Sequence, residues 1–349
     1  LVYDTLSHNQ VAIWEFDSEN IVPSNIEQDH FSASYKMHIS SGSLKDFHPT
    51  FNIPPNSVIQ ILKDNTFNEN VCDCDENIFD ECKMLSDIGI KRIEFIDDIF
   101  NVNVKHCASF FNSVKKAGMD IEFMFPNGLK GDLFTKELLD IMIDGGLGGM
   151  NLSLEHASPR MQKVMRKNLD VEKFRENIQY VATKYPSVVV GLYTMHGFPT
   201  ETEDEAYETL NFIKSIKWVH FPYMFNVRVF PGTEIEHFAL EQGISKKVIE
   251  ESQDMSYAEG SPTIAFSKEF TTMIRARFIK EYMLNKERLL KVLPHQMKRF
   301  TEDELDQKYK AYFPSTINTL NDLLNVVGIK KSELEVQECL DEKKIEIPN

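Results

Sequence analysis

The chain has 349 residues, of which 42% are hydrophobic and 26% are charged, and its formal net charge is −16. This is the composition of a globular protein with room for one large domain and a smaller one, and the negative charge argues against a nucleic-acid partner, because no clear basic patch offsets it. Five cysteines in so long a chain do not make a disulfide framework, and we recognise no signal peptide or membrane-spanning apolar run, so we expect a cytoplasmic protein.

Residues 1–56 are rich in turn-forming residues and show little hydrophobic periodicity. Stretches such as SENIVPSNIEQDH and NIPPNS combine Pro, Ser and Asn, which favour turns and loops. We therefore expect an extended lead-in or the remnant of an upstream domain. The first residue is Leu rather than Met, so we treat the chain as processed, truncated or incompletely represented.

From residue 57 to about residue 235, short apolar runs alternate with amphipathic segments. The runs typical of strands are SVIQIL, RIEFID, DIEFMFP, GMNLSLE, VVVGLYTMHG and MFNVRVF. The segments expected to be helices are residues 76–88, 103–117, 135–144, 171–184 and 204–216. This alternation predicts an α/β fold with a mostly parallel sheet. In a partial barrel, the polar or glycine-rich loops that follow the strands form the active-site face.

After about residue 235 the pattern becomes helical. The stretches are EHFALEQG, SKKVIEESQDMSYA, the long SKEFTTMIRARFIKEYMLNKERLLKVL, EDELDQKYKAYF, TINTLNDLLNVVG and KSELEVQECLDEKK. Their charge spacing suits solvated outer faces. We therefore expect three parts: the lead-in over 1–56, a partial (β/α)6 TIM-like barrel over 57–235, and a helical C-terminal region over 236–349.

The loops after the expected strands, taken in order, resemble those of a known family. The segments GIKRIEFIDDIFN, FPNGLKGD, LSLEHASPRMQKVMRKN, GLYTMHGFPTETEDEAYETLNFI and VRVFPGTEIEHFALEQG are similar to the radical S-adenosylmethionine superfamily, in particular its cobalamin-associated class. The resemblance covers residues 57–243, and the order and spacing of the motifs carry more weight than any one of them. It implies S-adenosylmethionine and a [4Fe-4S] cluster as cofactors, with cobalamin as a third cofactor in that class.

The resemblance also implies which residues meet S-adenosylmethionine. By position, Asp97, Asp98 and Asn101 follow the second strand, where the family binds the amino end of the cofactor. Glu155 ends the fourth strand and resembles an acidic residue that accepts hydrogen bonds from the amino or ribose groups. A simpler alternative for the two aspartates is a helix N-cap, which often follows a strand.

Further contacts are implied by the fifth and sixth strands. Gly197, Phe198 and Pro199 would form the turn under the adenine, because glycine permits close backbone approach. Arg228, on the sixth strand, could face the barrel interior and reach a carboxylate. The PGTE segment that follows is equally well explained as a turn that enters a helix.

Two further groups of residues have a functional and a structural interpretation. Arg166 and Lys167, in MRKN, belong either to a solvated face or to a cofactor contact. Three aromatic residues, Phe221, Tyr223 and Phe225, could line a substrate cavity, although core packing also explains them.

Three cysteines, Cys72, Cys74 and Cys82, cluster before the second strand and are the metal-ligand candidates. Thiolates bind iron–sulfur clusters, and in the family they stand in a C-x-x-x-C-x-x-C loop directly after the first strand. Here the corresponding loop, KDNTFNENVCDCDENIFDE, has no cysteine before Cys72, so the motif is absent. Cys82 should lie about 9 Å along a helix from its start, which makes a shared cluster awkward. Zinc held by Cys72, Cys74 and a histidine is an alternative, although C-x-C is not the usual zinc spacing.

Two explanations of the absent loop remain open. Either the chain is a cluster-less relative that keeps the fold, or the loop is missing from this sequence, with a splice between about Leu62 and Asn70. Residues 1–56 also lack the D-x-H-x-x-G loop of a cobalamin domain, so we do not expect cobalamin to bind there.

The leading hypothesis is a radical S-adenosylmethionine enzyme that carries out methyl transfer or a radical-based modification. The expected partners are a small-molecule or peptide substrate and a reducing protein such as flavodoxin or ferredoxin. One rival is a cluster-less family member that binds a peptide or a protein. Another is a barrel hydrolase in which Asp97, Asp98 and Glu155 hold a divalent cation.

Overall fold

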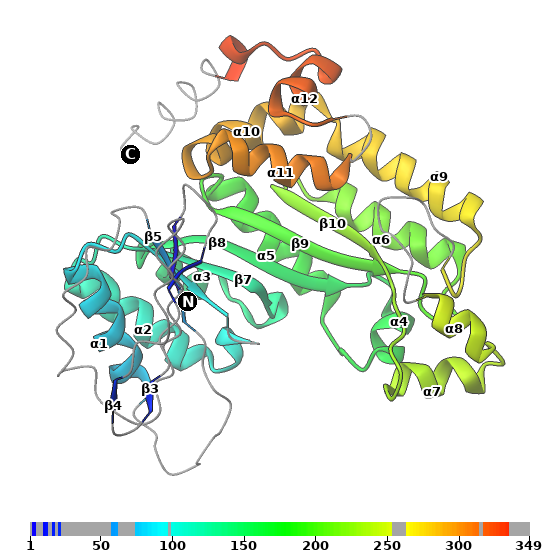
Figure 1. Cartoon of the computed structure of the whole chain (residues 1–349), viewed down its shortest axis with the longest axis horizontal. Coiled ribbons are helices and arrows are strands. Elements are labelled where there is room, and N and C mark those ends of the chain that lie inside the picture. The colour runs from blue at the N-terminus through cyan, green and yellow to red at the C-terminus, as the bar shows by residue number, and fades with distance from the viewer. Residues whose placement is uncertain are drawn as a thin grey trace. The chain divides into compact units, whose positions relative to one another are not determined.

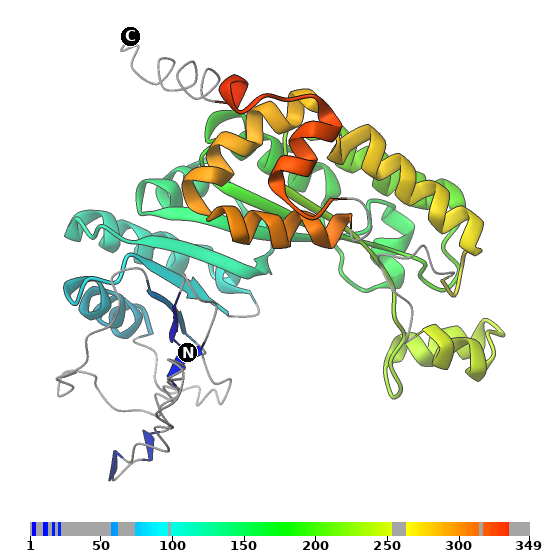
Figure 2. The ribbon, with the colours of Figure 1, turned by 45° about the horizontal axis from the view of Figure 1, so that its top comes forward.

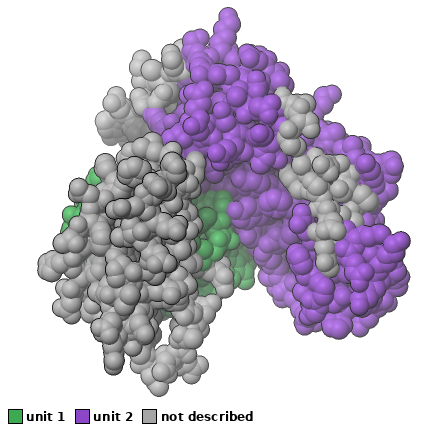
Figure 3. Space-filling model, viewed as in Figure 1, with its two compact units in different colours: residues 1–151 green, residues 152–349 purple. Residues whose placement is uncertain are grey.

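The computed structural model describes residues 74–96, 99–252, 263–313 and 317–334, together with short strands in the lead-in and residues 57–61. Side chains are described from residue 78 onward within those ranges. The chain divides into two compact units, residues 1–151 and 152–349 (Figure 3). The domain boundaries expected near residues 56 and 235 stay predictions.

The first unit contains a sheet whose parallel strands follow one another in chain order. Its strands are β1 (Val2–Asp4), β2 (Gln10–Ala12), β5 (Ser57–Ile61), β6 (Arg92–Phe95), β7 (Glu122–Leu129) and the first part of β8 (Leu147–Glu155), arranged β8-β7-β6-β5-β1-β2; β3 (Phe16–Asp17) and β4 (Asn20–Ile21) pair separately. Strands β5, β6 and β7 are parallel, whereas β1 is antiparallel to β2 and β5. The lead-in therefore adds strands to the sheet, which its turn-rich composition did not predict.

Helices connect these parallel strands, and an aromatic core packs between them. The helices are α1 (Cys74–Asp87), α2 (Val104–Ala117) and α3 (Lys136–Asp144), with short 3₁₀ turns η2 (Phe100–Val102) and η3 (Gly131–Leu133). Phe95 of β6 stacks on Phe125 of β7 with ring centroids 5.4 Å apart. Phe110 of α2 meets Phe123 of β7 edge to face at 5.4 Å. These buried rings pack α2 against β6 and β7.

The second unit continues the same alternation. The end of β8, β9 (Val189–His196) and β10 (Phe221–Asn226) are arranged β10-β9-β8, and β9 and β10 are parallel. Helices α4 (Pro159–Val164) and α5 (Val171–Lys184) lead from β8 to β9, and α6 (Glu203–Ser215) leads from β9 to β10 (Figure 1). Parallel strands in chain order, joined by helices, make a singly wound sheet of the partial-barrel type. The predicted α/β fold class is confirmed.

The C-terminal region is helical, as predicted. Its helices are α7 (Glu234–Glu241), α8 (Lys246–Ser252), α9 (Lys268–Phe278) with the π-helical turn η5 (Ile279–Met283), α10 (Lys286–Arg299), α11 (Glu302–Tyr312) and α12 (Leu320–Val327). The long helix expected over 267–293 is instead divided, because the Asn285 side chain accepts the Arg288 N–H at 3.0 Å and starts a new helix there. None of the described helices is long and apolar enough to cross a bilayer.

A buried arginine joins these helices to β10. Arg288 of α10 is fully buried, and its guanidinium donates to the carbonyl oxygens of Val219 (3.1 Å), Met283 (3.2 Å) and His220. The Tyr282 hydroxyl accepts the Val219 N–H at 3.0 Å. Figures 1 and 2 show α10 and α11 beside β10, whereas α9 lies beside α6. Because Val219 and His220 directly precede β10, this cluster anchors the amino end of that strand.

Candidate functional site

The end of β8 carries a residue in the left-handed region of backbone conformation. Glu155 has φ of 62°, which is uncommon for a residue with a Cβ and costs of order 1 kcal/mol or more. The buried Gln162 side chain of α4 holds this conformation, because its Nε2 donates to the carbonyl oxygens of Leu154 (2.8 Å) and His156 (2.5 Å) on either side of Glu155. Residue strain supported in this way is characteristic of functional sites.

Glu155 forms an ion pair at the end of β8. The Lys167 Nζ lies 2.6 Å from Glu155 Oε1, and the two side chains are 28% and 18% exposed. The neighbouring Arg166 instead pairs with Glu234 at 2.8 Å on the open surface, with both side chains more than 70% exposed. Of the two basic residues in MRKN, it is therefore Lys167 that lies with a predicted site residue.

The turn after β9 is held by a carboxylate and by close packing. A single carboxylate oxygen, Oε2 of Glu201, accepts hydrogen bonds from the N–H groups of Gly197 (2.6 Å) and Phe198 (2.9 Å). Gly197 has φ of 89°, and a Cβ there would lie 2.4 Å from the Cβ of Thr263. The close approach that this glycine permits is thus to a protein side chain. Pro199 is buried.

Phe198 points into an apolar cluster beneath this turn. The buried members of the cluster are Met161, Phe198, Val227, Val229, Ala239 and Ile249. They come from α4, the turn after β9, the segment after β10, and helices α7 and α8. The cluster therefore supports the turn from below, and the role predicted for Gly197, Phe198 and Pro199 in S-adenosylmethionine binding stays a prediction.

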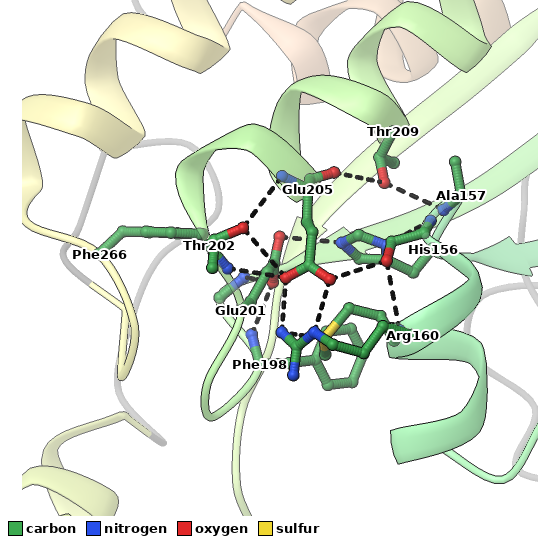
Figure 4. A network of polar contacts seen from close by, with 12 residues as sticks. His156, Ala157, Arg160, Phe198, Glu201, Thr202, Glu205, Thr209 and Phe266 are labelled. Carbon is green, nitrogen blue, oxygen red and sulfur yellow. Dashed lines mark hydrogen bonds and ion pairs between the residues drawn. The ribbon is translucent and has the colours of Figure 1, made fainter.

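A buried histidine links the ends of β8 and β9 (Figure 4). His156 Nε2 lies 3.0 Å from Glu201 Oε1, and both side chains are completely buried. The Ser158 N–H donates to His156 Nδ1 at 3.0 Å. Because Nδ1 accepts this bond, the ring proton lies on Nε2 and is donated to Glu201.

A second glutamate, Glu205 in the first turn of α6, binds the segment that follows β8. Glu205 Oε1 accepts from Ser158 Oγ (2.8 Å) and from Arg160 Nε (2.8 Å), and Thr202 forms a capping box with Glu205 at the start of α6. Arg160 also donates to the Thr200 carbonyl oxygen at 2.7 Å. The hydrogen bond from Arg160 is the main cause that lowers the pKa of Glu205 to about 2. Glu205 is therefore ionised at neutral pH.

His196, the last residue of β9, is buried next to this network without a hydrogen-bond partner for either ring nitrogen among the described residues. Its ring lies 6.3 Å from that of Phe266. Burial is the main cause that lowers the pKa of His196 to about 4, and the nearby backbone of Phe225 only partly opposes this shift. His196 is neutral at pH 7.

The remaining predicted contacts are placed elsewhere or lie outside the described residues. Asp97 and Asp98 are outside the described residues. Asn101, in the first unit, is buried and uses its amide on the backbone of Lys130, donating at 2.9 Å and accepting at 3.0 Å. Strand β10 ends at Asn226, so Arg228 lies beyond it with an exposed side chain, not on the strand as expected. Each proposed role in cofactor binding stays a prediction.

The expected sixth strand is shifted because its pairing with β9 begins earlier. Phe221 lies opposite Gly191, and Asn226 lies opposite His196 at the end of β9. Pro222 is tolerated because β10 is the last strand in the order β10-β9-β8.

The described cysteines do not suit a metal centre. Cys82 is completely buried in α1, and burial, reinforced by the charge of Glu81, raises the pKa of its thiol. Burial also raises the pKa of Cys107 to about 12. Protonated thiols are poor ligands, so this environment does not favour the predicted metal role of Cys82. Cys72 and the side chain of Cys74 lie outside the described residues, and the described part of the chain contains no group of three or more metal-ligating side chains.

Sequence reasoning missed the residues that hold the site together. They are His156, Ser158, Gln162, Glu201 and Glu205. Two local signals could have found some of them: Ser158 with Pro159 marks the start of α4, and Thr202-x-x-Glu205 is a capping box. The pairing of His156 with Glu201 has no local signal, because these residues are 45 positions apart.

Comparison with known proteins finds one matching family model. A family model described as the radical SAM superfamily matches residues 75–213. Within this segment the chain is similar to the radical SAM superfamily. The matched segment runs from α1 to α6 and so includes β8, β9 and the polar network described above.

The curated proteins that match the chain are distant and longer. An uncharacterized methyltransferase of Pyrococcus horikoshii is 24% identical over 225 residues, which are 63% of this chain and 47% of that protein. The ribosomal protein uS12 methylthiotransferase RimO of Aeromonas hydrophila is 29% identical over 38% of this chain and 33% of its own length. The tRNA-2-methylthio-N(6)-dimethylallyladenosine synthase of Protochlamydia amoebophila is 28% identical over 44% of this chain and 36% of its own length. The chain thus spans less than half of each relative.

A solved structure with partial similarity is the radical S-adenosylmethionine methyltransferase TsrM of Kitasatospora setae. It superimposes with a TM-score of 0.43 at 15% identity and covers 48% of this chain and 33% of its own.

Proposed function

We propose that this chain is a radical SAM enzyme that binds S-adenosylmethionine at the carboxyl ends of β8 and β9. It would use the cofactor for methyl transfer or for a radical-based modification of a substrate. The single observation that carries the proposal is the strained Glu155 with its partner Lys167, at the strand end that forms the active-site face in barrels of this type.

The chemistry of this pair suits the methionyl part of S-adenosylmethionine. That part carries an ammonium and a carboxylate group, and Glu155 and Lys167 offer one charge of each sign. The two side chains are partly exposed, so a ligand can reach them and exchange their mutual ion pair for two ion pairs of its own. Isothermal titration calorimetry of the full chain with S-adenosylmethionine tests this binding.

An iron–sulfur cluster is the second cofactor that the family resemblance implies. When bound, such a cluster supplies the electron that cleaves S-adenosylmethionine. The described cysteines, Cys82 and Cys107, do not fit a cluster, and the sequence has no C-x-x-x-C-x-x-C motif. Cys72, Cys74 and Cys82 stay the predicted ligands, although the raised pKa of the buried Cys82 thiol argues against the third.

Anaerobic reconstitution with iron and sulfide tests the cluster. The expected result is bound iron and, with a reductant such as flavodoxin or ferredoxin, release of 5′-deoxyadenosine. The variant Cys72→Ser/Cys74→Ser should lose both, whereas the control Cys107→Ser should keep both, because Cys107 is a buried helical residue. Absence of iron and of cleavage in the wild-type chain would contradict catalysis by this chain.

A second candidate is a cluster-less family member that binds a peptide or a protein. The absence of the cysteine motif and the protonated state of Cys82 favour it. It predicts stable binding of a partner without iron and without binding of S-adenosylmethionine in the same calorimetric experiment.

The class of substrate stays a prediction. The curated relatives are named for a ribosomal protein and for tRNA, so the expected small-molecule or peptide substrate and the expected absence of a nucleic-acid partner stay predictions. A cobalamin requirement is also a prediction, which methyl transfer assays with and without added cobalamin would decide.

A further inference from the structure

The buried pair of His156 and Glu201 is placed between the two segments proposed to bind S-adenosylmethionine. Glu201 uses one oxygen for the N–H groups of Gly197 and Phe198 and the other for His156. With both side chains completely buried, this carboxylate depends on these donors, because a buried charge without hydrogen bonds is costly.

His156 connects the carboxylate to the end of β8. It directly follows Glu155, and its Nδ1 is held by the N–H of Ser158. Its ring also meets that of Phe198 edge to face, with centroids 6.2 Å apart. The orientation of the imidazole is therefore fixed from three sides.

We propose that His156 and Glu201 are positioning residues for S-adenosylmethionine: together they hold the turn at Gly197–Thr200 in register with Glu155, and cofactor affinity depends on this bridge. The inference rests on the proposed function. Its physical basis is preorganisation, because a turn that is already ordered does not have to be ordered by the ligand.

The two nitrogens of His156 can be tested separately. In His156→Asn, the amide lies near the position of Nδ1, so the bond from Ser158 can be kept while the bond to Glu201 is lost. In His156→Gln, the amide reaches the position of Nε2 and can still donate to Glu201. His156→Gln is thus the conservative variant that should rescue what His156→Asn loses.

A matched control exists in the same unit. His220, also buried, accepts the N–H of Val190 at Nδ1 (3.2 Å) and places Nε2 3.1 Å from the Pro186 carbonyl oxygen. It lies just before β10, at the opposite end of the strands from Glu155. His220→Asn should therefore match the general destabilisation of His156→Asn without touching the turn.

Two measurements decide the proposal. In hydrogen exchange, the amides of Gly197 and Phe198 should exchange about tenfold faster in His156→Asn and in Glu201→Asp than in wild type, but not in His220→Asn. In calorimetry, the affinity for S-adenosylmethionine should fall about tenfold in His156→Asn and return to within about threefold of wild type in His156→Gln.

Unchanged exchange at Gly197 and Phe198 in the folded His156→Asn protein would overturn the proposal. An equal loss of affinity for S-adenosylmethionine in His220→Asn would also overturn it. That result would show that His156 and Glu201 affect affinity only through the overall stability of the protein. A wild-type chain that does not bind S-adenosylmethionine would reject the proposed function and, with it, the affinity claim, while the exchange data would still decide whether the pair holds the turn.

Discussion

Two buried polar clusters of the second unit lie at opposite ends of its parallel strands and differ in kind. At the amino end of β10, Arg288 and Tyr282 bind backbone groups that have no left-handed residue among them, and the guanidinium is completely buried. At the carboxyl ends of β8 and β9, the network includes the left-handed Glu155 and reaches the surface through Lys167. The first cluster is expected to serve stability, and the second to combine stability with binding.

The largest effect should come from the amino-end cluster. Arg288→Met removes one hydrogen-bond donor from each of three buried carbonyl groups, although Gln296 still donates to that of His220. It should lower the free energy of unfolding by about 3 kcal/mol, as measured by urea denaturation. Lys286→Met, on the same helix but exposed, should change it by less than about 1 kcal/mol. If folded Arg288→Met protein lost affinity for S-adenosylmethionine, the division of roles between the two clusters would be wrong.

The turn after β9 should be nearly as sensitive. In Gly197→Ala the new Cβ meets Thr263 at 2.4 Å, so the variant combines backbone strain with a clash and should lose about 3 kcal/mol of stability. Gly232→Ala is the matched control, because its φ of 79° is similar but nothing lies within 4 Å of the added Cβ. It should lose only about 1 kcal/mol. Equal losses measured by thermal unfolding would show that packing against Thr263 is unimportant.

Glu205 gives an intermediate effect that depends on pH. Glu205→Gln should cost about 2 kcal/mol at pH 7, whereas Glu203→Gln, exposed in the same first turn of α6, should cost little. Because the pKa of Glu205 lies at about 2 in the folded state, below its ordinary value of 4.5, its contribution is present above pH 4.5 and is lost as the pH falls toward 2. Urea unfolding should therefore show the wild type and Glu205→Gln converging at low pH, and a constant difference would contradict this assignment.

The smallest effect on stability should come from the ion pair at the end of β8. Lys167→Met removes a partly exposed pair and should change the free energy of unfolding by less than about 1 kcal/mol. Its affinity for S-adenosylmethionine should nevertheless fall about tenfold, because a charge-assisted contact to the cofactor is lost. Arg166→Met is the neighbouring control and should leave the affinity unchanged.

The separation along the sequence between contacting residues explains which features the sequence could predict. The alternation of apolar runs and amphipathic segments predicted the parallel strands and α1, α2, α3, α5 and α6, because hydrophobic periodicity is local. Glu155 was predicted because the end of its strand resembles the corresponding part of the radical S-adenosylmethionine superfamily, and its role stays a prediction. By contrast, the partner of His156 is 45 positions away, and the left-handed conformation of Glu155 depends on Gln162 of a helix that was not predicted. Such contacts exist only after the chain has folded.

Gln162 has a consequence for how this site can change. Its amide donates to the carbonyl oxygens of Leu154 and His156, the residues before and after Glu155, and not to the Glu155 carboxylate. The backbone conformation at position 155 is therefore held without the Glu155 side chain. A different polar residue could be installed at position 155, to alter ligand preference, without redesigning the corner that presents it.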